Sequence, residues 1–244
     1  VGANRLRDLE TTVSMFEDIH DHRNTQACTR HYLSLEETEI SKVALNAYVV
    51  SKITFANFLG RLCDGIENVD VHNITKTIGN DKRISPYFFS SGTPYGGTCF
   101  PRDTWAFIKF ARDQGHEAKN LMFSEEVNQL VHDSIYQKAV NACSDSGSIG
   151  ILGVSFKPKS PVTIGSPSMA LIDQWIRDGI DVHTYDPLEE TYDGMPPRQH
   201  FIPCQTPEMV ISRCEVVVIM HPDKSFNNLD FMGKVVIDPW GVLE

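Results

Sequence analysis

The sequence reads SIGILGV over residues 148–154, an almost unbroken apolar run without a charged side chain. A short apolar run of this kind predicts a strand buried on both faces, as in a parallel sheet. The segments downstream alternate between apolar runs and helical patterns, which predicts a parallel sheet covered by helices. Strands are predicted at 182–185, 216–220 and 235–238, and helices at 167–178 and 206–213.

Upstream of this region, residues 35–64 carry a wide apolar stripe at helical spacing that no proline interrupts. Ser34 suits an N-cap, and Glu36 and Glu37 suit the first turn. About 30 residues at about 1.5 Å each make a rod of about 45 Å. A rod of that length usually packs against a partner, often a second copy of itself. Shorter helices are predicted at 8–20, 102–114 and 120–143, with a loop over 80–101 and a domain boundary near residue 145.

Composition limits the classes of function. The chain has 244 residues, 41% hydrophobic and 22% charged, which is typical of a soluble protein with one large or two ordinary domains. Its formal net charge of −10 makes a nucleic-acid partner unfavourable. No apolar run reaches the ~18–20 residues of a membrane span, so we expect no membrane partner. Six scattered cysteines without a Cys-x-x-Cys pair suggest a cytoplasmic protein with free thiols.

The sequence PYGGTCFPRD over residues 94–103 is the best candidate for a reactive centre. Two glycines allow a close backbone approach, and Pro101 suits the first turn of a helix that begins just after Cys99. A helix N-terminus and the neighbouring Arg102 both favour the thiolate, which is the nucleophilic form. Asp103 opposes that effect but could orient a water molecule. The alternative is a glycine-rich turn with a buried cysteine and a proline-capped helix.

Two further stretches carry polar groups in places where chemistry is possible. Glu39, Lys42 and Asn46 share one face of the long helix, where Lys42 and Asn46 could stabilise an oxyanion. A solvated stripe with a Glu39–Lys42 ion pair is the alternative. Lys157 follows the strand at 148–154 at its carboxyl end, where open parallel sheets bind ligands. A simple loop lysine is the alternative there, and the glycine spacing is not that of a dinucleotide site.

Together these stretches resemble the UDP-glucose/GDP-mannose dehydrogenases, which are nucleotide-sugar 6-dehydrogenases. That family has a Glu-x-x-Lys-x-x-x-Asn helix, matched by Glu39, Lys42 and Asn46. Its nucleophile loop, Gly-aromatic-Gly-Gly-x-Cys-Phe/Leu-Pro-Lys-Asp, is matched at all but two positions. Its Gly-hydrophobic-x-Phe-Lys strand is matched by residues 153–157 and is followed by Tyr-Asp-Pro at 185–187. The three motifs occur in family order from about residue 30 to the end.

The resemblance implies an α/β protein with a central long-helix dimerisation domain at 31–145 and a Rossmann-like UDP-sugar-binding domain at 146–244. Residues 1–30 would be the remnant of an NAD-binding domain that is otherwise absent. The implied reaction oxidises the C6 alcohol of a UDP-glucose-like sugar to a carboxylate with NAD, through a thioester on Cys99. The implied catalytic residues are Cys99, Lys42, Asn46 and Asp103. The implied substrate residues are Lys157, Arg83 (reaching a neighbouring subunit), Phe88, Tyr95, Gly96 and Phe156, and Arg102 and Gly97 would contact the cofactor.

Several residues depart from the family pattern. Pro94 replaces a loop glycine, and Arg102 replaces a lysine. Ile164 and Trp240 stand where the family has arginines near the cofactor and the nucleotide sugar. The chain also starts without an initiator Met and lacks a Gly-x-Gly-x-x-Gly segment, so we expect little turnover from this chain alone.

Three readings stay open at this point: a fragment of a dehydrogenase, one subunit of a split enzyme, or a non-catalytic binding or dimerisation module. The sugar and the base are also open, although the resemblance favours UDP. We expect no metal site. The side chains at Asp18, His20, His22, Cys28 and His31 are metal-like in composition, but their spacing fits no zinc pattern.

Overall fold

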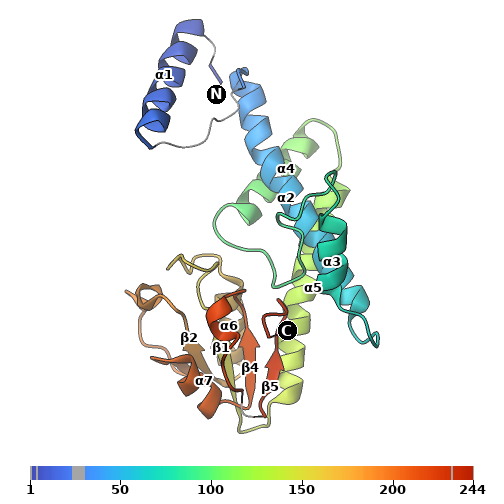
Figure 1. Ribbon diagram of the computed structural model, residues 1–244, viewed down its shortest axis with the longest axis vertical. Coiled ribbons are helices and arrows are strands. Elements are labelled where there is room, and N and C mark those ends of the chain that lie inside the picture. The colour runs from blue at the N-terminus through green and yellow to red at the C-terminus, as the bar shows by residue number, and fades with distance from the viewer. Residues whose placement is uncertain (1, 4, 24–30, 232, 244) are drawn as a thin grey trace.

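A computed structural model describes residues 2, 3, 5–23, 31–231 and 233–243, except the side chains of residues 6 and 20–23. The molecule is elongated, with helices in its upper part and a sheet in its lower part (Figure 1). Helix α1 (Leu6–Arg23) lies at the far upper end, away from the sheet.

The helical part is organised around α2 (Leu35–Cys63), a 29-residue helix that packs on α4 (Phe100–Asp113) and α5 (Lys119–Ala142). Ser34 is its N-cap, as predicted: the Glu37 amide donates to the Ser34 hydroxyl, and the Glu37 carboxylate accepts from the Ser34 amide. Helix α3 (Val71–Gly79) follows, with Asp70 as its N-cap. The stretch from 80 to 99 contains turns and bends, which agrees with the predicted loop.

Among the described helices, α2 alone is long and apolar enough to cross a membrane by length and composition. Two of its amide side chains are bonded within the protein: Asn46 binds Asp103 of α4, and Asn57 binds the backbone of residues 92 and 93. These bonds and the packing on α4 and α5 fix one side of α2, while large apolar side chains such as Leu45 and Tyr48 stay exposed on the rest of the helix.

The lower part is a sheet of five parallel strands in the order β3-β2-β1-β4-β5. The chain runs from β1 outward to β3 and then returns to the other side of β1 with β4, so the strand order reverses between β1 and β4. This is the doubly wound arrangement, in which ligands bind at the carboxyl ends of the strands near the crossover. The strands are β1 (Ser148–Leu152), β2 (Asp181–Tyr185), β3 (Phe201–Pro203), β4 (Val216–Ile219) and β5 (Val235–Ile237).

Each face of the sheet has its own apolar core, because successive strand side chains point to opposite faces. Ile149 and Ile151 of β1 belong to the core beneath α5 and α6 (Pro167–Arg177), which includes the fully buried Trp175. Leu152 belongs to the opposite core, with Val210 and Ile211 of α7 (Pro207–Arg213). The α/β fold predicted from the sequence is therefore confirmed.

The predicted helices and strands are found within a few residues of their expected bounds. The sequence interpretation omitted four short elements. Strand β3 has three residues and ends in a proline, so it lacks the alternation that marks a longer strand. The other three are α3 and the 3-10 helices Glu189–Tyr192 and Lys224–Phe226.

Candidate active site

Cys99 lies at the start of α4, where the chain turns from the glycine-rich loop into the helix. It occupies the N-cap position with Pro101 in the first turn, and its carbonyl accepts from the Asp103 amide at 2.8 Å. Its side chain is exposed, so the alternative of a buried structural cysteine does not hold. Cys204 and Cys214, in contrast, are buried in the C-terminal domain.

Asp103 is one helical turn after Cys99 and is the centre of a polar cluster. One carboxylate oxygen accepts from Asn46 Nδ2 at 2.6 Å and from Lys42 Nζ at 3.2 Å. The other accepts from Arg102 Nε at 2.9 Å and pairs with Arg102 Nη2 at 2.8 Å. The cluster therefore joins two helices, and Lys42 pairs with a residue 61 positions away.

The charges of the cluster stabilise one another. Burial alone would raise the pKa of Asp103, but the hydrogen bonds from Arg102, Lys42 and Asn46 outweigh it and hold the pKa below its usual value. The hydrogen bond and charge of Asp103 raise the pKa of Arg102, with a smaller contribution from the charge of Cys99. The Lys42 side chain is 60% exposed, so its ammonium retains donors for a ligand while it holds Asp103.

The loop before Cys99 meets the C-terminal domain through backbone. The Gly97 amide donates to the Gly165 carbonyl at 2.8 Å. Both glycines have positive φ, 80° for Gly97 and 70° for Gly165, which other residues rarely adopt. A Cβ on Gly96 would lie 2.3 Å from the Gly165 oxygen, and one on Gly97 would lie 2.6 Å from the Phe156 ring. The expected residues Gly96, Gly97 and Phe156 therefore meet at the domain junction.

Lys157 follows Phe156 on the loop after β1, and its ammonium lies 5.1 Å from the centre of the Phe156 ring. The loop is held by Asp186, a 3%-exposed carboxylate just after β2. One oxygen of Asp186 accepts from the Val154 amide at 2.8 Å, the Ser155 amide at 2.9 Å and the Ser155 hydroxyl at 3.0 Å. The other accepts from the Leu188 amide at 3.1 Å.

The sequence interpretation quoted Asp186 only as part of a motif and gave it no role. An acidic residue after the second strand of such a sheet is a candidate partner for a ribose hydroxyl. Here both of its oxygens are occupied by the protein itself. His221 completes the arrangement, since its Nε2 lies 2.7 Å from the Ser155 carbonyl and burial lowers its pKa.

Three expected substrate residues make contacts outside the hydrogen bonds of the Asp103 cluster. Arg83 is highly exposed and paired with Asp81 at 2.7 Å. Phe88 is 56% exposed, with its ring 6.1 Å from that of Phe100 in an edge-to-face contact. Tyr95 is 7% exposed, and its hydroxyl donates to Glu125 of α5, so its side chain points into the helical domain.

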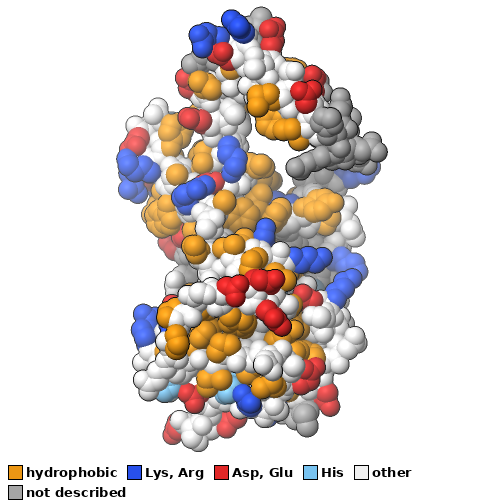
Figure 2. Space-filling view, turned by 90° about the vertical axis from the view of Figure 1, so that its left-hand side faces the viewer, with side chains coloured by type: hydrophobic (Ala, Val, Ile, Leu, Met, Phe, Trp, Pro, Cys, Tyr) orange, Lys and Arg blue, Asp and Glu red, His pale blue; other side chains and the backbone are white. Residues whose placement is uncertain are grey.

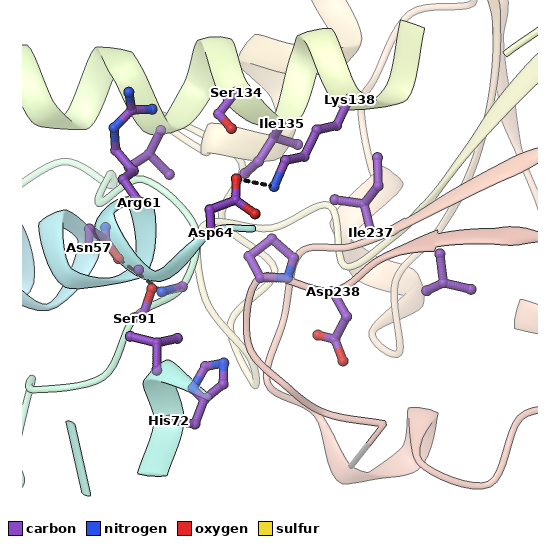
Figure 3. A pocket seen from close by; sticks show the side chains of 16 residues that line it. Asn57, Arg61, Asp64, His72, Ser91, Ser134, Ile135, Lys138, Ile237 and Asp238 are labelled. Carbon is purple, nitrogen blue, oxygen red and sulfur yellow. Dashed lines mark hydrogen bonds and ion pairs between the residues drawn. The ribbon is translucent and has the colours of Figure 1, made fainter. Parts of the chain in front are cut away.

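A separate cavity of about 310 Å³ lies between the two domains (Figure 3). It is bounded by the end of α2, the start of α3, α5 and the end of β5, and an Asp64–Lys138 ion pair of 2.8 Å lies on one side. The residues that line it include Asn57 and Gly92 but neither Cys99 nor Asp103. The cavity therefore borders the loop that precedes Cys99 without containing the Cys99 thiol.

Over the part of the chain that the structure describes, no three His, Cys, Asp or Glu side chains are grouped so as to hold a metal ion. The sequence cluster from Asp18 to His31 lies largely outside the described residues.

Comparison with known proteins agrees with this arrangement. The profile "UDP-glucose/GDP-mannose dehydrogenase family, central domain" matches residues 36–130, and that of the family's "UDP binding domain" matches residues 150–244. The chain is 28% identical over 205 residues to a UDP-glucose 6-dehydrogenase of Pseudomonas aeruginosa, in an alignment covering 80% of this chain and 45% of that protein. It is 32% identical over 189 residues to UDP-glucose 6-dehydrogenase AglM of Haloferax volcanii, covering 77% and 43%.

Solved structures give the same answer. The UDP-glucose dehydrogenase of Pyrobaculum islandicum superposes with a TM-score of 0.85 at 27% identity, over 99% of this chain and 55% of that one. A GDP-mannose dehydrogenase of Pseudomonas aeruginosa, at 22% identity and a TM-score of 0.58, shares the fold. The chain spans about half the length of the relatives it matches. With two family profiles matched in order and both domains superposed, the chain belongs to the UDP-glucose/GDP-mannose dehydrogenase family, the nucleotide-sugar dehydrogenases.

Proposed function

We propose that this chain supplies the nucleophile and the nucleotide-sugar half of an enzyme that oxidises the C6 alcohol of UDP-glucose, or a similar UDP-sugar, to a carboxylate. The observation that carries the proposal is the buried Asp103 carboxylate, held by Lys42, Asn46 and Arg102 one helical turn from an exposed Cys99. Because the chain spans about half the length of its relatives, the complete reaction is assigned to the whole protein.

The proposed reaction removes two hydrides from the sugar C6 carbon, and two molecules of NAD, bound in turn, would each accept one. Loss of the first hydride and of the hydroxyl proton gives the C6 aldehyde. The Cys99 sulfur adds to the C6 aldehyde and forms a thiohemiacetal, and loss of the second hydride leaves a thioester. Water then attacks the thioester carbon, the carbon–sulfur bond breaks, and the carboxylate and the thiol are released. Lys42 and Asn46 donate to the oxygen that becomes negative in these additions, and Asp103 orients the water.

The described residues fit only a small part of an NAD site. Arg102 is 69% exposed and can meet an anionic group, whereas Gly97 is buried against the Phe156 ring. Ile164 is 71% exposed and offers no charge where the family has an arginine. Asp186, the acidic residue after β2, already accepts four hydrogen bonds from the protein, which leaves it poorly placed to bind a ribose.

Alkylation of the thiols tests the proposal. Cys99 should react with iodoacetamide faster than Cys204 and Cys214, which are 6% and 1% exposed. UDP-glucose should slow the reaction of Cys99 at least fivefold and leave the other cysteines unchanged, as read by peptide mass mapping. The Cys99→Ser variant should give no alkylated peptide at position 99, which identifies Cys99 as the thiol that UDP-glucose protects. Reaction of Cys99 at the same rate with and without UDP-glucose would favour the alternative of a non-catalytic module.

That alternative has one specific observation in its favour. The Trp240 ring lies against Gly92, where a Cβ would be 2.4 Å from it, and the indole nitrogen donates to the Met220 carbonyl at 2.9 Å. An uncharged ring therefore stands where the family has an arginine near the nucleotide sugar. UDP alone should still protect Cys99 if the nucleotide binds in spite of this change.

We also propose that two copies associate through α2. The helix exposes large apolar side chains, among them Leu45 at 59%, Tyr48 at 64% and Phe55 at 51%. Apolar side chains are also visible on the surface in Figure 2. Large exposed apolar areas of this kind are typical of interfaces.

We also propose a cytoplasmic location. Its reducing conditions would keep the Cys99 thiol free for the proposed chemistry.

The Tyr48→Asp variant should therefore convert a dimer into a monomer, because it places a charge in the centre of the proposed interface. Sedimentation velocity measures the change. Lys109→Ala, which removes an exposed ion pair with Asp113 on α4, is the control and should remain dimeric. A wild-type chain that sediments as a monomer at high concentration would contradict the proposal.

A further inference from the structure

We propose that Asn57 and Asn128 are positioning residues that fix the nucleophile loop, residues 92–99, from two different helices. Asn57 Oδ1 accepts from the Gly92 amide at 2.9 Å, and its Nδ2 donates to the Thr93 carbonyl at 3.3 Å. Asn128 Oδ1 accepts from the Tyr95 amide at 2.8 Å, and its Nδ2 donates to the Tyr95 carbonyl at 3.1 Å. The inference rests on the proposed role of Cys99, because the purpose of the fixed loop is to place that thiol.

Asparagine suits this task because its side chain has one acceptor and one donor group, like a peptide group. The loop is neither helix nor strand at these positions, so its backbone groups need other partners. Asn57 is 2% exposed and Gly92 is buried, so these bonds are made away from water. Bonds of this kind are costly to break, because each one lost leaves a buried group without a partner.

The two asparagines bind the loop backbone on opposite sides of Pro94. Asn57 binds residues 92 and 93, and Asn128 binds residue 95. Asn57 comes from α2 and Asn128 from α5, two helices that pack on each other. In Figure 3, Asn57 lies next to Ser91 at the edge of the interdomain cavity. Pro94 has no amide hydrogen, so the two side chains hold the residues around the one position that cannot donate.

Helix α5 holds Tyr95 by its side chain as well as by its backbone. Glu125 accepts from the Tyr95 hydroxyl and lies three residues before Asn128, on the same face of α5. Burial and the neighbouring Glu125 raise the pKa of Tyr95, so the phenol keeps its proton and remains a donor. The segment from 96 to 99 then runs from this fixed point to Cys99, with the Gly97–Gly165 bond as its next support.

The Asn128→Asp variant tests the inference with little change in packing. It keeps an acceptor for the Tyr95 amide but places a second acceptor against the Tyr95 carbonyl. Asn128→Ala removes both bonds. Each variant should weaken protection of Cys99 by UDP-glucose about five- to tenfold and change the alkylation rate of Cys99 by more than threefold. Hydrogen exchange should increase at residues 92–99 and stay unchanged in the sheet.

Gln129→Ala is the matched control, because Gln129 is the next residue of α5 and its amide binds only the exposed Asp133. All measurements are made well below the thermal unfolding midpoint of each variant, so that a general loss of stability does not contribute. If Asn128→Asp keeps the alkylation rate, the protection and the exchange of wild type within twofold, the inference is wrong.

The same experiment separates failure of the inference from failure of the proposed function. A wild-type chain that UDP-glucose does not protect argues against the proposed function. In that case the exchange of residues 92–99 and the alkylation rate still decide whether the asparagines fix the loop.

Discussion

Asp186→Ala is expected to lower the free energy of unfolding of the C-terminal domain by about 3–5 kcal/mol. The carboxylate accepts four hydrogen bonds, and removing it leaves the Val154, Ser155 and Leu188 amides without partners. Asp186→Asn should also destabilise, because its amide group presents a donor to one of these donors. Urea unfolding followed by tryptophan fluorescence measures the effect.

The stabilisation by the Asp186 carboxylate is expected to decrease at low pH. Burial raises the pKa of Asp186, but the hydrogen bonds from Ser155, Leu188 and Val154 and the charge of His221 bring it below the usual value. The stabilisation is therefore present above the unfolded pKa of about 3.9 and is lost as the pH falls through the lower folded pKa. The difference between wild type and Asp186→Ala should shrink below about pH 4.

Asp173→Ala provides the comparison, since Asp173 forms a partly exposed ion pair with Arg198 and should cost at most about 1 kcal/mol. Equal losses for the two alanine variants would show that the Asp186 network does not carry the stability assigned to it.

Gly165→Ala is expected to have the second large effect, a loss of about 3 kcal/mol and at least tenfold weaker protection of Cys99 by UDP-glucose. The new Cβ would lie 2.8 Å from the Gly97 carbonyl oxygen and 3.0 Å from its carbon, which are backbone atoms that cannot rotate away. A positive φ of 70° adds about 1 kcal/mol of strain. Both changes displace the nucleophile loop from the C-terminal domain.

Gly179→Ala is the matched control for backbone strain. Gly179 also has a positive φ, 81°, but a Cβ there would meet no atom within 4 Å. That variant should lose about 1 kcal/mol and keep the protection by UDP-glucose. If Gly165→Ala also keeps full protection, the glycine contact does not set the position of the loop.

Much of the fold follows from local patterns in the sequence. The apolar run at 148–154 contains the strand Ser148–Leu152, which is buried on both faces, and Ser34 with Glu37 starts the long helix. Strand β3 was not predicted because three residues are too few to show the alternation of apolar and polar side chains. Its place in the sheet depends on pairing with β2. Nonlocal pairing of that kind cannot be read from a short segment alone.

The site was predictable only in part, for the same physical reason. Helical spacing puts Lys42 and Asn46 on one face, but their partner Asp103 comes from another helix, and the expected Glu39–Lys42 pair was only one possibility. Asn57 offered a signal, because an amide within the apolar run of α2 needs a partner. Asn128 lies on a mixed helix face and gave no such signal.

Helix α5 sets the limits within which the two halves of this chain can be exchanged between relatives. Its first turns pack with Leu121 against the helical domain, whereas Val131, Ile135 and Ala139 belong to the core of the sheet domain. The two family profiles end and begin at residues 130 and 150, so these core residues lie between them. A chimaera joined near residue 145 would graft a foreign helix onto the sheet. A crossover in the turn near residue 115 would set a foreign α5 against α2, on which it also packs, so a junction on either side of α5 breaks one of its two sets of contacts.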